Sequence, residues 1–424
     1  MITLRPAIAA VAVGTAFLTV GVTGASAATK LSGEITFVTQ DSNAPADRYL
    51  AAAFQKKYPG VKVNYQPIPG GAVGLNTVLA PQLQGGGGPD VFMVFAGRGI
   101  NPSGIRLFEA GRTSDLSKAP WVKRTPKIVK QLNTTRGKTF MAMTPTPTSA
   151  MMYDVNKFRE LKLKVPKTWK ELLALCRTIR QKSPSTIPFA TGGSQFSFNA
   201  VIASIFAGQT VYSKDPRWDG KRQRNQTTFA GTAGWRAALQ RFVDMKNNNC
   251  LSPGVATDTN ASSVAQVATG RAVMMAGPSL YIPQLQAANP NGKYSTFPVP
   301  GDTAKQTRLM IFLNQAYTVN KNAKNPAAAR AFVDFFSTTK IAAAWGRLGG
   351  GVSLSEVGNK KPKVASEFSS MKPLLAKSRT VLGPFANWPT GSTFDTMGRV
   401  VQTIYTGQAT VSEALARLDS TWAK

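Results

Sequence analysis

Side chains that could carry out covalent chemistry are scarce in this sequence. The chain of 424 residues has no histidine, two cysteines, and 20 aspartate and glutamate residues. Without an imidazole, Ser-His-Asp and Cys-His catalysis and the usual zinc and iron ligand sets are excluded. Paired carboxylates could still cleave a glycosidic bond, but no pair is singled out by its sequence context. We expect no metal site and no enzyme activity, with a carboxylate-dependent glycan hydrolase as the alternative.

Two glycine-rich segments invite comparison with nucleotide-binding loops. Gly85–Gly88 is followed by Pro89 and Asp90 rather than by the Gly-Lys-Ser/Thr of a phosphate-binding loop. Gly97-Arg98-Gly99 lacks the third glycine of a dinucleotide fingerprint. Both segments are therefore interpreted as turns, and no cofactor is expected.

The charge balance is strongly basic. Lysine and arginine total 51 against 20 acidic residues, which gives a formal net charge of +31. Because the basic residues are spread from Lys56 to Lys424 without one dense tail, we expect a solvated basic surface and no nucleic-acid partner. Weak attraction to an anionic cell envelope and recognition of an acidic ligand stay open as alternatives.

Residues 1–27 have the order of a secretory signal peptide. Arg5 precedes an apolar run from Ala7 to Val22, and Ala25 and Ala27 fit the small-residue rule for cleavage before Ala28. An uncleaved membrane anchor is the alternative. No lipobox cysteine lies near the cleavage position, so we expect an exported protein without a lipid anchor, in a periplasm or at the cell envelope or outside it. An oxidising compartment favours a disulfide between Cys176 and Cys250 over two buried thiols.

The first part of the predicted mature chain alternates strands and helices. Strands are predicted at 34–39, 61–65 and 91–95, and helices at 49–58 and 75–83, the second disturbed by Pro81. This order predicts an α/β fold with a mainly parallel sheet, whose ligands bind at the carboxyl ends of the strands. The loops after Phe37 and Phe95 are therefore favoured for binding.

Helices dominate the rest of the chain. Prolines at 145 and 147 make residues 144–148 a candidate connection between two lobes. Apolar side chains recur at helical spacing in 168–182, 233–246 and 327–345, and Thr410 with Glu413 forms a capping box that opens a final helix.

Several motifs together resemble the family 1 extracellular solute-binding proteins of ABC importers, a sugar-binding group of which maltose-binding protein is a member. Their order and spacing along most of the chain carry the resemblance. They are ITFVTQDS at 35–42, AFQKKYPGVKV at 53–63, GPDVF at 88–92, YDVNKF at 153–158, PKTWKEL at 166–172, GRAVM at 270–274 with GP at 277–278, and GQATVSEAL at 407–415.

The resemblance implies a two-lobed periplasmic-binding-protein fold of type II, with crossing hinge segments and a ligand cleft between the lobes. The first lobe would be 28–146 plus 303–350, and the second 147–302 plus 351–424. The chain would be a monomer that captures a sugar or related carbohydrate and delivers it to membrane permease subunits. An anionic ligand such as glycerol phosphate or a sugar acid is an alternative, favoured by the charge and by Arg98. An exported carboxylate-dependent glycan hydrolase is the second alternative.

The resemblance also implies which residues contact ligand. A sugar needs polar side chains for its hydroxyls and aromatic rings for its flat C–H faces. Ser279 stands where relatives often carry tryptophan, which removes one stacking surface, and Asp154 replaces a usual asparagine. The implied ligand-binding residues are Gln40, Asp41, Ser42, Gly97, Arg98, Ser279, Tyr281, Gly349, Gly350, Phe385, Trp388 and Phe394.

Overall fold

Three parallel strands begin the larger of the two main sheets, as the alternation predicts, but the sheet is mixed rather than mainly parallel, because its other two pairings are antiparallel. The computed structural model describes residues 31–125, 127–312, 315–352 and 356–422, so the predicted signal peptide lies outside the described residues. β1 pairs in parallel with β2 and β3, and β13 pairs antiparallel with β3 and β6. The sheet order is β2-β1-β3-β13-β6. Its strands are β1 (Gly33–Gln40), β2 (Val61–Ile68), β3 (Val91–Phe95), β6 (Ala142–Met143) and β13 (Gln315–Val319).

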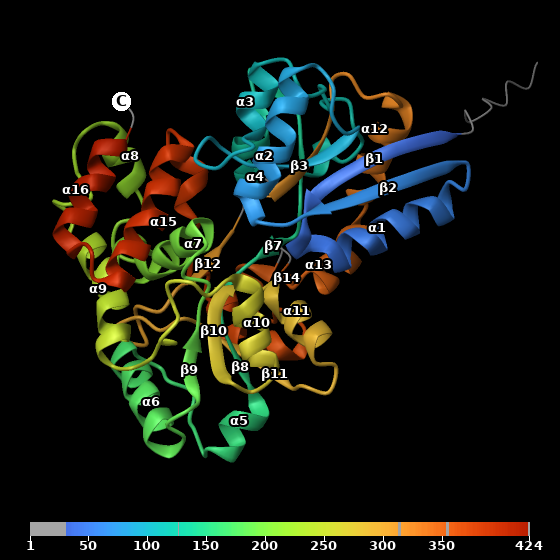
Figure 1. The fold of residues 1–424 in the computed structure, drawn as a ribbon. Helices are drawn as coiled ribbons and strands as arrows, with labels where there is room; N and C mark the ends of the chain where they lie inside the picture. The colour runs from blue at the N-terminus through green and yellow to red at the C-terminus, as the bar shows by residue number, and fades with distance from the viewer. Residues whose placement is uncertain (1–30, 126, 313–314, 353–355, 423–424) are drawn as a thin grey trace, which may run out of the picture.

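Helices cover this sheet and form the first lobe, in the upper right of Figure 1. α1 packs along β2 and against α13, α2 packs on β1 and β2, and α12 packs on β13. Every residue of β3 is buried, as expected for a strand covered on both faces. The helices are α1 (Ala44–Lys57), α2 (Gly71–Gln84), α3 (Gly104–Glu109), α4 (Lys127–Asn133), α12 (Pro326–Phe336) and α13 (Thr339–Leu348); a hairpin joins β4 (Thr134–Thr135) to β5 (Lys138–Thr139).

A second sheet, with the order β11-β8-β10-β9, forms the core of the lower lobe in Figure 1. Here β10 pairs in parallel with β9 and antiparallel with β8. The strands are β8 (Ser149–Asp154), β9 (Ile187–Ala190), β10 (Ala272–Pro278) and β11 (Tyr294–Phe297). The helices beside them are α5 (Val155–Glu160), α6 (Trp169–Lys182), α10 (Asn260–Ala268), α11 (Tyr281–Ala288) and α14 (Lys372–Ala376).

A helical group packs beside the second sheet, at the left of Figure 1. α7 packs against α9 and α15, and α16 packs against α9 and α15. A disulfide joins Cys176 of α6 to Cys250, which follows α9. No helix among the described residues is long and apolar enough to cross a membrane. The group consists of α7 (Phe196–Ala207), α8 (Trp218–Gln223), α9 (Ala233–Asn247), α15 (Gly391–Thr406) and α16 (Val411–Thr421).

Short strands connect the lobes. β7 (Thr146–Pro147) pairs with β14 (Gly351–Val352), and Thr148 bridges to Ile311 at the end of β12 (Leu309–Ile311). β12 also pairs with β15 (Thr380–Leu382). Segments far apart in the sequence thus lie side by side where the chain passes between the lobes (Figure 1). The exact lobe boundaries stay a prediction.

The structure differs from the sequence prediction at two helices. The helix predicted over 327–345 is two helices, because the backbone of Thr338 is extended, with φ −72° and ψ 142°, between the end of α12 and the start of α13. The Ser337 and Thr338 hydroxyls donate to the carbonyls of Val333 and Phe335 at this break, at 2.9 and 2.8 Å. In contrast, α2 continues through Pro81 to Gln84, so this proline does not end the helix.

Candidate functional site

The loop after β1 lies at the edge of the first sheet that faces the second lobe. Gln40 is the last residue of β1 and is buried, while Asp41–Asn43 form a single 3₁₀ turn with Asp41 exposed. The Asn43 amide donates to the Gln315 side-chain oxygen at 3.2 Å, which fastens the turn to β13. Although Asp41 is exposed as a whole, the neighbouring protein partly removes its carboxyl from water, which raises the pKa of Asp41. Gln40, Asp41 and Ser42 are therefore held together at this edge.

A buried carboxylate fixes the position of this loop. Asp47, in the first turns of α1, accepts hydrogen bonds from the Thr39 hydroxyl at 2.6 Å and the Trp345 indole at 2.7 Å, and from the Tyr317 hydroxyl. Burial raises the pKa of Asp47 to about 6. Because these donors come from β1, β13 and α13, Asp47 links three elements directly behind the loop.

The loop after β3 is pressed against the segment after β15. Gly97 has a φ of +72°, and a Cβ there would overlap the carbonyl of Ala386. The neighbouring Arg98 makes a bidentate ion pair with Glu109, with N–O distances of 2.9 and 2.6 Å. These hydrogen bonds lower the pKa of Glu109. The Arg98 charge is thus already compensated within the first lobe. This weakens the prediction that Arg98 binds an anionic ligand.

Ser279 and Gly350 meet where the lobes join. The Ser279 hydroxyl is fully buried, accepts from the Thr148 amide at 3.1 Å and donates to the Gly350 carbonyl. Gly350 has a φ of +66°, and Gly349 beside it is buried as well. Ser279 and the glycines therefore hold the connection between the lobes, and the Ser279 hydroxyl is occupied by protein partners.

Hydrogen bonds link the starts of three helices at the carboxyl ends of β9 and β10. The Gln195 side-chain oxygen accepts from the backbone N–H of Asn260 at 2.8 Å, and the Asn260 side-chain amide donates to the Tyr281 hydroxyl at 2.9 Å. Gln195 immediately precedes α7, while Asn260 and Tyr281 begin α10 and α11. The Oδ1 atom of Asn260 is buried without a hydrogen-bond partner among the described residues. We call Gln195, Asn260 and Tyr281 the polar triad.

The predicted ligand-binding residues include Tyr281 but not Gln195 or Asn260. The missed signal was the segment Thr191-Gly192-Gly193, which follows the apolar run of β9 as Gly97 follows β3. Its place at the carboxyl end of a parallel strand could have identified it.

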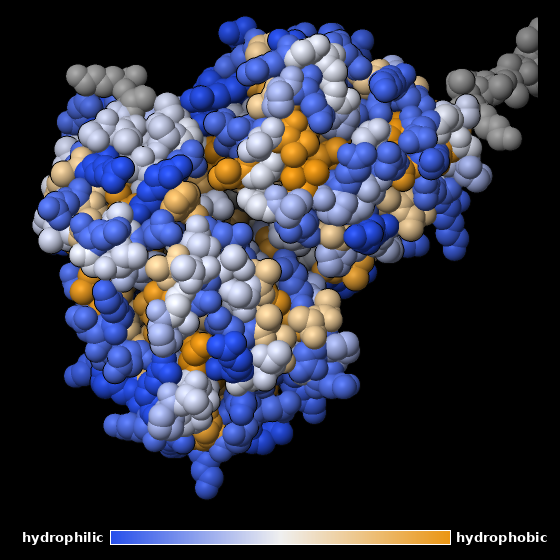
Figure 2. Space-filling model, in the orientation of Figure 1, coloured by the Kyte–Doolittle hydropathy of each residue, from blue (hydrophilic) through white to orange (hydrophobic). Residues whose placement is uncertain are grey.

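Asp41 and Tyr281 approach each other across the two lobes. Burial, and next the negative charge of Asp41, raises the pKa of Tyr281. Beside them, the Gln284 side chain donates to the Ser42 carbonyl at 3.4 Å. At a second place where the lobes meet, the Arg106 guanidinium donates to the Pro389 carbonyl at 2.8 Å. The lobes are closed on each other, with a narrow recess between the two masses in Figure 2.

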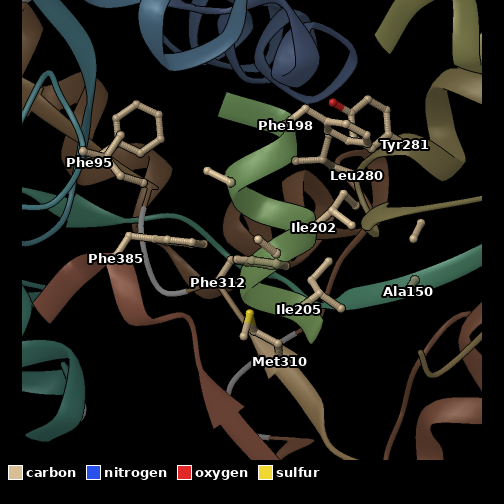
Figure 3. Close-up of a cluster of buried hydrophobic side chains, with 14 of the residues drawn as sticks. Phe95, Ala150, Phe198, Ile202, Ile205, Leu280, Tyr281, Met310, Phe312 and Phe385 are labelled. Carbon is tan, nitrogen blue, oxygen red and sulfur yellow. The ribbon is translucent and has the colours of Figure 1, made fainter. Parts of the chain in front are cut away.

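The three predicted aromatic contacts are packed inside the protein. Phe385 is stacked on Phe312 with centroids 6.2 Å apart and meets Phe394 edge-on at 5.1 Å. Trp388 is 1% exposed and donates to Asp219 at 3.3 Å. Figure 3 shows Phe385 and Phe312 on one side of α7, with Tyr281 on the other side near Phe198. In this closed structure none of the three rings has an open face.

The arrangement supplies reversible contacts rather than reacting groups. The polar triad offers hydrogen-bond donors and acceptors, and Phe198 meets the Tyr281 ring edge-on at 5.6 Å. Polar groups beside buried aromatic rings suit a polyhydroxylated ligand. Within the described ranges, no group of three or more acidic or sulfur side chains could hold a metal ion.

Comparison with known proteins gives a family match over most of the chain. The sequence model described as bacterial extracellular solute-binding protein matches residues 39–343. The multiple sugar-binding protein of Streptococcus mutans is 21% identical over 292 residues, covering 68% of this chain and 66% of that protein. The chain spans about two thirds of the length of the curated relatives it matches.

Solved structures share the fold. RafE in complex with raffinose has a TM-score of 0.72 at 20% identity, over 92% of this chain and 99% of that chain. A sugar transporter protein of Bacillus licheniformis in complex with stachyose has a TM-score of 0.69 at 18% identity, with the same coverage of 92% and 99%. These likenesses establish the predicted two-lobed α/β architecture.

Proposed function

The chain belongs to the bacterial extracellular solute-binding protein family, and from this premise we propose that it captures a sugar or related carbohydrate between its lobes. The captured ligand then passes to the membrane permease of an ABC importer. Members of this family are binding proteins, so the chain holds its ligand and releases it chemically unchanged. The protein acts as an exported monomer.

The observation that carries this proposal is the polar triad opposite Asp41 and Ser42. The unpartnered Asn260 Oδ1 accepts a hydrogen bond from a ligand hydroxyl, because a buried acceptor left unpaired costs free energy. Asp41, at the edge of the first lobe, accepts a second one. Two hydroxyls held from opposite lobes favour the closed state, since the ligand then bonds both sides only when the cleft is shut.

The relatives support a carbohydrate as the ligand class. One solved neighbour holds raffinose and another holds stachyose, and a curated relative is named a multiple sugar-binding protein. All three are similar to this chain at low identity, so they support a class of ligand and not one sugar. Raffinose and stachyose are the first two sugars to assay.

An anionic ligand is the second candidate. The helix starts at Phe196, Asn260 and Tyr281 carry partial positive charge that favours an anion. The ion pair between Arg98 and Glu109 acts against it, because that guanidinium is already bonded. The neutral carbohydrate is therefore the primary proposal.

The test is the melting temperature of residues 28–424 with raffinose, stachyose, polyols, sugar acids and glycerol phosphates at two salt concentrations. A ligand at 100 times its Kd should stabilise the fold by about 2.7 kcal/mol. We expect a salt-insensitive shift with a neutral sugar, and chromatography should recover that sugar intact. A shift with anions only would favour the second candidate, and hydrolysis of the sugar would overturn the binding-protein proposal.

A matched pair of variants locates the contact. Asp41→Asn and Glu34→Gln each remove one exposed negative charge from the two ends of β1. Asp41→Asn should reduce the sugar-dependent shift, whereas Glu34→Gln should leave it unchanged. Equal effects of the two variants would contradict a ligand contact at Asp41.

A further inference from the structure

A large cavity is lined by residues other than the predicted ligand-binding set. Its volume is about 890 Å³, which is within the usual range for small-molecule sites. Ala142 and Met143 of β6 line it, whereas the loops after β1 and β3 do not. Since β6 is the edge strand of the first sheet, the cavity lies at the far edge from β1 and β2. None of the twelve predicted ligand-binding residues lines this cavity, which we call the rear cavity.

Both lobes and the connection between them build the rear cavity. Trp121 and Phe336 belong to the first lobe, and Pro145 and Val352 belong to the connecting segments. Phe368 belongs to the η5 turn (Ser366–Met371), which packs against β11 of the second sheet. Rotation of one lobe against the other therefore changes the width of the rear cavity.

The lining is apolar with cations at its margin. Trp121, Phe336 and Phe368 are buried aromatic side chains, while Arg124, Arg347 and Lys363 are exposed. Among the described residues, none of these three cations has a carboxylate within ion-pair distance.

Glu356 is the single acid among the described residues of the lining, and its side chain already accepts hydrogen bonds. It accepts hydrogen bonds from the Asn359 side chain at 2.9 Å and from the Lys363 backbone amide at 2.7 Å. The margin is therefore positive around an apolar interior.

We propose that the rear cavity binds a second ligand, an organic anion with an apolar body. The apolar body occupies the space between the aromatic side chains, and the anionic group pairs with Arg347 and its neighbouring cations. Because rotation of the lobes changes the width of the cavity, a ligand that fits the cavity of the closed lobes binds them more tightly than it binds open lobes, and so stabilises the closed state. This coupling rests on the proposed sugar-binding function, whereas the cavity itself does not.

By linkage, such an anion raises sugar affinity, and the sugar raises anion affinity by the same factor. The anion would thus act as a positive effector of capture, at a site separated from the sugar by the connecting strands.

The test uses calorimetric titration of residues 28–424 with decanoate, and with decanol as the uncharged control. Arg347→Gln and Lys340→Gln remove the same charge from exposed positions on the same helix, α13, but only Arg347 lines the cavity. We expect Arg347→Gln to weaken decanoate binding about tenfold, as for loss of a charge-assisted hydrogen bond. Lys340→Gln should bind as the wild type does, and decanol should bind more weakly than decanoate.

Each outcome decides between the two proposals. Absence of decanoate binding, or equal binding by the two variants, would overturn the rear site and leave sugar binding intact. Decanoate binding that discriminates the variants, in a protein that binds no sugar, would support the rear site and overturn the proposed function. If both bind, saturating decanoate should lower the Kd of raffinose or whichever sugar binds, and an unchanged Kd would overturn the coupling.

Discussion

The Ser279 hydroxyl donates to the carbonyl of Gly350, and a Cβ on Gly350 would overlap the carbonyl of Ser279. The end of β10 therefore touches the last segment that connects the lobes at these two residues. The contact is as close as a glycine permits. The same hydroxyl accepts from the Thr148 amide in the first connecting segment at 3.1 Å. One serine thus fixes the relative position of two connecting segments.

Gly350→Ala should force this contact apart. A matched control exists in Gly111, which has a φ of +71° against +66° at Gly350 but has no atom within 4 Å of the place that an added methyl group would take. Gly111→Ala should cost about 1 kcal/mol for its left-handed backbone alone. Gly350→Ala should cost about 1–3 kcal/mol more through overlap, and it should weaken ligand affinity by disfavouring closure. Urea unfolding and ligand titration measure both effects, and equal losses in the two variants would contradict the contact.

The disulfide between Cys176 and Cys250 should contribute substantially to stability. It closes a loop with a sequence separation of 74 residues, which corresponds to about 4 kcal/mol in the chain-entropy model. We expect urea unfolding of the wild type to shift to lower denaturant when a reductant is added. The double variant Cys176→Ala, Cys250→Ala should be less stable and should not respond to reductant. A wild type that is insensitive to complete reduction would contradict this expectation.

The sequence was sufficient for the elements whose pattern is local. The strand at 91–95 was recognisable from its continuous apolar run, and the last helix from the capping box that Thr410 and Glu413 form. The break at Ser337 and Thr338 was not, because serine and threonine occur inside helices as well as at their ends. The break lies in the backbone of Thr338, whose ψ is 142°.

The candidate site was predictable only in part, because its contacts join distant segments. Trp388 lies between Pro384 and Pro389, a setting that indicates a loop. In the structure, its indole bonds Asp219, a residue 169 positions away, and its ring packs against Trp235. Neither the hydrophobic periodicity of the sequence nor the spacing of its motifs reveals such a partner. Asn260 was missed for the same reason, since its partners Gln195 and Tyr281 are 65 and 21 positions away.

Asp219 should give the protein a distinctive pH dependence. It is buried, accepts from the Tyr212 hydroxyl at 2.7 Å and from Trp388, and burial raises its pKa to about 6. Because the unfolded carboxyl titrates near 3.8, the unfolded state binds fewer protons between these two values. The contribution of Asp219 to the free energy of unfolding is therefore full below pH 3.8. It falls by about 3 kcal/mol as the pH rises to 6.

Asp219→Asn removes this titration while keeping the side-chain shape. The stability of the wild type relative to this variant should be greater at pH 4.5 than at pH 7, measured by urea unfolding. Asp115 is the control, because hydrogen bonds from Ser117 and Lys138 outweigh burial and lower its pKa to about 2. The contribution of Asp115 to stability is lost only as the pH falls toward 2. The difference in stability between Asp115→Asn and the wild type should therefore be the same at pH 4.5 and 7. Equal differences for Asp219→Asn as well would refute a raised pKa at Asp219.

Glu109 should control whether Arg98 is available to an anionic ligand. The two side chains form a bidentate ion pair that is partly exposed, with side-chain exposures of 42% for Arg98 and 25% for Glu109. Glu109→Gln should therefore change the free energy of unfolding by less than about 1 kcal/mol. It should strengthen binding of a sugar acid, because the guanidinium loses its carboxylate partner, and leave binding of a neutral sugar unchanged.

A second acid separates this local effect from net charge. Glu160 forms an exposed ion pair with Lys157 in the other lobe, with an N–O distance of 3.0 Å. Glu160→Gln makes the protein more positive by the same amount but leaves Arg98 paired. If titration finds that both variants gain the same affinity for the sugar acid, the gain comes from the overall field. If only Glu109→Gln gains affinity for the sugar acid, and added salt reduces the gain, the gain comes from Arg98. The ion pair then normally selects for neutral ligands.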